Sequence, residues 1–130
     1  MKYVLCFGNP HIKEDSLALD IADYFHNHPL PDIEFIKCIA PDEVMSYIDK
    51  DFWILDIVSN ITEPTLITDI DNLSNQPAIS LHDFDLGFFL RMMKEMHKIE
   101  NIKIIGIPST ADIKILITDI KKILTTSPGP

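Results

Sequence analysis

Three side chains that commonly bind divalent metal ions stand out in this sequence: Asp15, Asp56 and His82. Asp15 lies in the turn-like stretch "GNPHIKEDSLAL", Asp56 follows four apolar residues near the end of the strand-like run "FWILDIV", and His82 precedes the helical stretch "DFDLGFFLRMM". Two carboxylates and an imidazole would hold a borderline divalent cation and leave coordination positions open for another molecule. The residue types therefore predict a cation site, provided that the fold brings the three side chains together.

Each of these residues also has a structural interpretation, which the sequence leaves open. Asp15, next to Ser16, is a natural N-cap for the helix that follows, and the sequence alone favours this role. His82 could equally cap the helix that begins near Asp83. Asp56 is harder to explain structurally, because an acid inside an apolar strand loses hydration unless it is paired or lies at the strand's exposed end.

The other reactive side chains are expected to be structural. Asn9 follows the permissive Gly8, and it either donates to a substrate or holds the turn. His11 and Glu14 are expected to be solvated loop residues. Water-facing positions near helix ends are expected for His26, His28 and His97, and core packing for Met92, Met93 and Met96. No serine or cysteine has a visible base partner, so nucleophilic catalysis is not indicated.

Four apolar runs, rich in β-branched and aromatic residues, predict strands buried on both faces over residues 2–7, 33–39, 52–58 and 103–108. Helical spacing follows each run, with stripes formed by Leu17, Ile21, Tyr24 and Phe25; by Val44, Tyr47 and Ile48; by Leu86, Phe89, Leu90, Met93 and Met96; and by Ile113, Leu116, Ile117, Ile120 and Leu124. This alternation predicts an α/β fold, a three-layer α/β/α sandwich around a mostly parallel twisted sheet. The alternating stretch "TLITDI", between Pro64 and Pro77, predicts an extra edge strand.

Composition narrows the class of protein. The length of 130 residues and the hydrophobic fraction of 46% predict one domain over residues 1–125 with a flexible tail over 126–130. A net charge of -9 without a Lys/Arg cluster argues against nucleic-acid or anionic-membrane partners. Cys6 and Cys38 lie in apolar runs and are expected to be reduced core thiols, which suits the cytoplasm. Without a signal-peptide pattern or a membrane-spanning run, neither export nor membrane insertion is expected.

Ligands of open parallel sheets bind beyond the carboxyl ends of the strands. The predicted topology places Asn9 after the first strand and Asp56 at the end of the third, with Asp15 and His82 at the starts of the flanking helices. All four residues are therefore expected at one edge of the sheet.

The order of these residues resembles that of the nickel–iron hydrogenase maturation endopeptidases, over almost the whole chain. The family's Gly-Asn and acidic pair match "FGNPHIKED", its strand-closing aspartate matches Asp56, and its helix-opening histidine matches His82 in "PAISLHDFDLGFF". Its late Gly-hydrophobic-Pro motif matches "IIGIPS".

The resemblance implies an endopeptidase that removes the C-terminal extension of a hydrogenase large-subunit precursor. It also implies that Asp15, Asp56 and His82 are both the metal ligands and the catalytic residues, with Asn9 as a substrate-binding residue. The nickel would arrive with the substrate, and no permanently bound cofactor is expected. The enzyme is expected to be a cytoplasmic monomer. Asp15 or Asp56 could instead act as a general base, and the sequence does not choose between these roles.

Departures from the family pattern motivate a second hypothesis. Cys6 stands where the family commonly has a glycine, and "KCIAPDEV" lacks the Gly-Thr loop that usually follows the second strand. The chain could therefore be a degenerate relative that binds metal or a precursor peptide without cutting it. Receiver and flavodoxin-like domains fit less well, because "IIGIPS" lacks the receiver lysine and "GNPHIKED" makes a poor phosphate loop.

Overall fold

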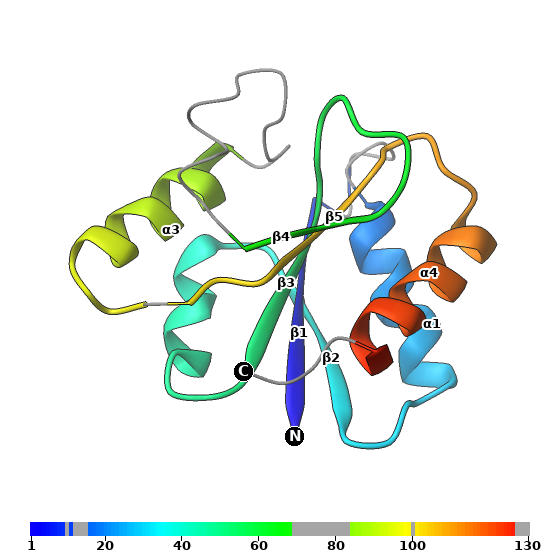
Figure 1. Ribbon diagram of the computed structural model, residues 1–130, viewed down its shortest axis with the longest axis horizontal. Coiled ribbons are helices and arrows are strands. Elements are labelled where there is room, and N and C mark those ends of the chain that lie inside the picture. The colour runs from blue at the N-terminus through cyan, green and yellow to red at the C-terminus, as the bar shows by residue number, and fades with distance from the viewer. Residues whose placement is uncertain (10, 12–15, 69–83, 100, 127–130) are drawn as a thin grey trace.

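The computed structural model describes residues 1–9, 11, 16–68, 84–99 and 101–126 (Figure 1). Its elements are, in chain order, β1 (Lys2–Phe7), α1 (Leu17–Asn27), β2 (Ile33–Cys38), the 3-10 helix η2 (Pro41–Tyr47), β3 (Phe52–Ile57), β4 (Thr65–Ile67), α3 (Phe84–Glu95), β5 (Ile104–Ile107) and α4 (Ile113–Thr126). The four strands predicted from apolar runs are all present, with ends within one residue of those expected. Of the stretch "TLITDI", the structure describes Thr65–Ile67 as a strand. The predicted tail, residues 126–130, lies outside the described residues except for Thr126, which ends α4.

The described strands form one sheet in the order β2-β1-β3-β5-β4. β1 pairs with β2 and β3 in parallel, and β3 pairs with β5 in parallel. The short β4 pairs antiparallel with β5 and forms an edge of the sheet. The predicted parallel sheet with an extra edge strand is therefore confirmed.

Helices cover both faces of the sheet, with α1 and α4 on one face and η2 and α3 on the other (Figure 1). Alternate residues of β3 point into the two layers, because successive strand side chains face opposite ways. Trp53, Leu55 and Ile57 belong to the cluster under α1 and α4. Phe52, Ile54 and Val58 belong to the cluster under η2 and α3. Burial on both faces is why β3 reads as a continuous apolar run. β2 lies at an edge of the sheet and exposes Glu34 and Lys37, so its expected burial on both faces is wrong.

The methionines in and just after α3 only partly follow the prediction. Met93 is buried, but Met92 and Met96 are 39% and 55% exposed, so their expected core packing is wrong. α3 ends at Glu95, and the Lys98 amide donates to the Met93 carbonyl as the chain turns away. Met96 therefore lies beyond the last turn that packs on the sheet, and the apolar spacing alone could not show where the helix stops.

The segment after β2 is a 3-10 helix whose only buried residue is Val44. Its start is fixed by Glu43, whose Oε2 accepts hydrogen bonds from the backbone amides of Ile39 at 2.7 Å and Ala40 at 2.8 Å. A carboxylate that reaches back to the amides before a helix satisfies donors that have no partner inside the helix. This cap fixes the turn between the end of β2 and the start of η2.

Both cysteines are buried free thiols, as predicted. Cys6 belongs to the cluster under α1 and α4, whereas Cys38 belongs to the cluster under η2 and α3. Burial raises the pKa of the Cys38 thiol to about 12, and the neighbouring Glu43 carboxylate adds to the shift. Burial also raises the pKa of Cys6, with a smaller contribution from Cys38.

Within the part of the chain that the structure describes, no helix combines the length and apolarity needed to cross a membrane.

Candidate functional site

Asp56 is fully buried near the carboxyl end of β3, the central strand of the sheet. In the described residues it is the only charged side chain that is buried. It shares the face of β3 on which Ile54 and Val58 pack against the η2 and α3 layer. An ionised carboxylate is costly to remove from water unless charges or donors compensate it, so this position in an apolar layer points to a specific role.

Gly106 of β5 lies directly beside Asp56, because the two residues are paired in the parallel register. A Cβ atom at position 106 would lie 2.6 Å from Cγ2 of Val58 and 3.4 Å from Cδ1 of Ile67. Because Gly106 has no side chain, Val58 and Ile67 pack close to the backbone of β5 next to Asp56. Sequence reasoning missed this contact, although a glycine inside a strand is itself a signal of close approach.

Asn9 lies two residues beyond the end of β1, the neighbouring strand to β3. Its Oδ1 accepts a hydrogen bond from the backbone amide of His11 at 2.9 Å, which is the geometry of an Asx turn. The structure thus supports the turn-holding role of Asn9. Because β1 and β3 are adjacent and parallel, Asn9 and Asp56 both lie at the carboxyl edge of the sheet, as predicted.

Two members of the predicted triad, Asp15 and His82, lie outside the described residues, together with Glu14. Their flanking elements are described. Ser16 occupies the N-cap position of α1, and its carbonyl accepts a hydrogen bond from the Asp20 amide at 2.9 Å. The N-cap position itself is occupied by Ser16, and the role of Asp15 stays a prediction. α3 begins at Phe84, two residues after His82 in the sequence.

Among the described side chains, no three of the histidine, cysteine, aspartate and glutamate residues stand together as a metal site. The histidines expected to face water do so: His11, His26, His28 and His97 are all exposed. His26 contacts the Phe35 carbonyl oxygen through Nε2 at 2.6 Å, and the His28 ring stacks on Tyr24 at 4.3 Å. These contacts of His26 and His28 lie near the end of α1.

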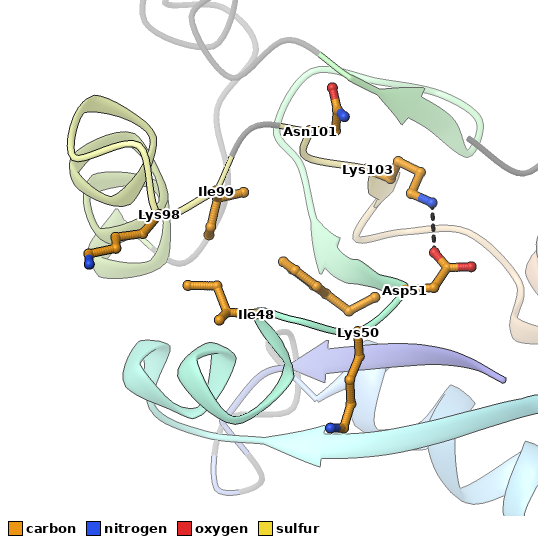
Figure 2. Close-up of a pocket in the computed structure, with 8 residues that line it drawn as sticks. Ile48, Lys50, Asp51, Lys98, Ile99, Asn101 and Lys103 are labelled. Carbon is orange, nitrogen blue, oxygen red and sulfur yellow. Dashed lines mark hydrogen bonds and ion pairs between the residues drawn. The ribbon is translucent and has the colours of Figure 1, made fainter.

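A cavity of about 450 Å³ opens at the opposite edge of the sheet (Figure 2). It lies where β3 and β5 begin, lined by Ile48, Lys50, Asp51, Phe52, Lys98, Ile99, Asn101 and Lys103. Its carboxylate, Asp51, is held by Lys103 at 2.8 Å, and Lys50 and Lys98 extend in different directions. Phe52 is four residues before Asp56, which corresponds to about 13 Å along an extended strand. This cavity is therefore separate from the predicted site.

The fold is similar to those of three solved proteins, each of which is named as an endopeptidase or a hydrogenase maturation protease. The endopeptidase HycI from Escherichia coli superposes with a TM-score of 0.68 and 20% identity, covering 97% of this chain and 90% of its own. The [NiFe] hydrogenase maturation protease HybD from Thermococcus kodakarensis gives a TM-score of 0.70 and 14% identity, covering 96% and 97%. The hydrogenase-maturating endopeptidase HybD from E. coli gives a TM-score of 0.69 and 15% identity, covering 97% and 93%.

No family model matches the sequence. No curated protein matches it either. The likeness is therefore one of three-dimensional structure, at identities where only the fold is shared. Over nearly its whole length, the chain has the three-layer α/β fold of the hydrogenase maturation endopeptidases.

Proposed function

We propose that the protein is an endopeptidase that removes the C-terminal extension of a nickel-loaded hydrogenase large-subunit precursor. The observation that carries this proposal is the buried carboxylate of Asp56 at the carboxyl end of the central strand. Ligand sites of open parallel sheets lie at this edge. The shared fold supports the same reaction class, because the neighbours are themselves described as maturation proteases or endopeptidases.

In this proposal Asp56 ligates the nickel that the precursor brings, together with Asp15 and His82. Carboxylate oxygens and an imidazole nitrogen form a suitable donor set for a borderline divalent cation. A bound cation of this kind polarises a peptide carbonyl, or lowers the pKa of a bound water from ~16 toward ~7. Burial of Asp56 suits this role, since a charged ligand in a water-poor layer interacts strongly with a cation.

Asn9 has a supporting role in the same proposal. Its Oδ1 is engaged by the His11 amide, which fixes the turn after β1. We propose that the side-chain amide nitrogen of Asn9 donates a hydrogen bond to a carbonyl of the substrate. The turn thus presents one donor at the carboxyl ends of the strands, where Asp56 lies near the end of β3.

The test is cleavage of the nickel-loaded precursor from the protein's own source, followed by the mass of the product. Asp56→Asn, Asp15→Asn and His82→Ala are each expected to lower the cleavage rate by on the order of a hundredfold, because the first two replace a charged ligand with a neutral amide and the third removes the imidazole ligand. Asp49→Asn and His28→Ala make the same chemical changes at exposed positions outside the site, and they should leave the rate unchanged.

Two results would contradict the proposal. Unchanged cleavage by Asp56→Asn would remove Asp56 from the site. Tight binding of the precursor by the wild-type protein without cleavage would favour the degenerate relative that binds but does not cut.

A further inference from the structure

Gly106 and Val58 form a contact beside Asp56 that the assignment of metal ligands does not use. Val58 is the next residue after Asp56 on the same face of β3, and it is buried, with 2% exposure. A Cβ atom placed at position 106 would meet both Cγ2 of Val58 at 2.6 Å and its Cβ at 3.1 Å. The isopropyl group of Val58 therefore occupies the space that any side chain at position 106 would need.

The backbone around this contact is held from both sides. The Val58 amide donates to the Ile107 carbonyl at 3.0 Å, which extends the ladder between β3 and β5 one residue past Ile57. On the far side of β5, Gly106 pairs with Thr65 of β4, and Ile67 approaches the same space at 3.4 Å. Val58, just past the end of β3, thus packs directly on the backbone of Gly106.

From this geometry we propose that Gly106 is a positioning residue, which sets the Asp56 carboxylate through its contact with Val58. The inference rests on the proposed function, because the position of Asp56 matters only if Asp56 acts in the reaction. A methyl group at position 106 must displace the Val58 side chain, since real Cβ atoms essentially never come within 2.6 Å of another heavy atom. Rotation of that side chain moves Cγ2 but not Cβ, which would itself lie 3.1 Å away, so we expect the last residues of β3, which carry Asp56, to shift with Val58.

A displacement of this kind affects catalysis more than substrate binding. Misplacement of a catalytic group by about 1 Å can cost on the order of a hundredfold in rate. The other ligands of the proposed site would still hold the nickel that the precursor brings, so the affinity for the precursor should change less than the rate. Gly106→Ala is therefore expected to lower kcat by about tenfold or more, with a smaller relative change in KM.

The decisive experiment combines this variant with Val58→Ala. Removing both Val58 methyl groups eliminates the 2.6 Å approach and leaves only the 3.1 Å contact, which small shifts can relieve. The double variant Gly106→Ala/Val58→Ala should therefore recover most of the kcat that Gly106→Ala loses. Ile57→Val, which trims the same strand on its opposite face, is the control for simple destabilisation and should keep the wild-type kcat.

A second measurement does not depend on activity. Amide signals of Asp56, Ile57 and Val58 in two-dimensional NMR spectra should shift in Gly106→Ala and return toward wild type in the double variant. If Gly106→Ala fails to fold, Val58→Ile tests the same contact from the other side, because it enlarges the residue that packs on Gly106. We expect that variant to lower kcat as well.

The outcomes separate this inference from the proposed function. A wild-type protein that does not cleave the precursor overturns the proposed function, and the NMR signals then decide whether the contact positions Asp56. An active wild type whose Gly106→Ala variant keeps full kcat overturns the positioning role. The positioning role is also overturned if adding Val58→Ala restores the amide signals but does not restore kcat.

Discussion

At the scale of single residues, the pKa of the Cys38 thiol is set by its surroundings. The thiol is buried where β2 ends, and burial raises its pKa to about 12 from an ordinary value of 9.0. Near neutral pH the folded protein therefore holds Cys38 as the protonated thiol, which is a poor nucleophile. We expect both cysteines to resist alkylation in the native protein and to react rapidly once it is unfolded.

The same shift makes a prediction about pH. Because the folded-state pKa lies above the unfolded one, the unfolded chain loses this proton first as pH rises. Stability from this group is complete below about pH 9 and decreases as pH rises toward about 12. Urea unfolding at increasing pH should show this decrease, and Cys38→Ala should reduce its slope. Fast alkylation of Cys38 in the native state would contradict the assigned burial.

At the scale of elements, the turn between β2 and η2 depends on one carboxylate. Glu43 Oε2 accepts from two amides, those of Ile39 and Ala40, at 2.7 and 2.8 Å. Glu43→Ala leaves both donors without this acceptor and should lower the free energy of unfolding by about 1–2 kcal/mol. Glu43→Gln keeps an acceptor oxygen and should lose less.

Urea unfolding measures this effect directly. Asp42→Ala is the matched control, because it removes a charge from the same helical turn while Glu43 keeps its two hydrogen bonds. If Glu43→Ala and Asp42→Ala lower the free energy of unfolding equally, the charge at the start of the helix stabilises the protein and the two hydrogen bonds do not.

At the scale of the whole molecule, two hydrophobic clusters share one sheet. β3 contributes alternate residues to each cluster, so neither cluster can persist when the sheet is lost. Leu116→Ala in the cluster under α4 and Leu90→Ala in the cluster under α3 should each cost about 2–5 kcal/mol. Both variants are expected to unfold in a single transition.

The protein's single tryptophan makes this prediction easy to check. Trp53 is 1% exposed, and the ammonium groups of Lys103 and Lys2 lie 4.6 Å and 5.5 Å from its ring centroid. Unfolding should move Trp53 into water and change its fluorescence. Fluorescence and circular dichroism should give coincident curves in both variants. Separate transitions would mean that the two layers unfold independently.

The sequence by itself determined the elements and the order of the fold. Continuous apolar runs such as residues 52–58 predicted strands buried on both faces, and the alternating stretch that contains Thr65–Ile67 predicted the edge strand. These predictions succeeded because burial and periodicity are local properties of the chain. The position of Asp56 near the carboxyl end of its strand was predictable for the same reason. The places of Asp15 and His82 in the site stay predictions.

Tertiary structure alone decided which side chains meet. The pairing of Asp56 with Gly106 and the packing of Val58 on that glycine depend on the register between strands almost fifty residues apart. The exposure of Met96 depends on where α3 turns away from the sheet. Spacing along the chain fixes the direction of a side chain within its own element. Its neighbours in other elements are set only when the sheet assembles and the register is chosen.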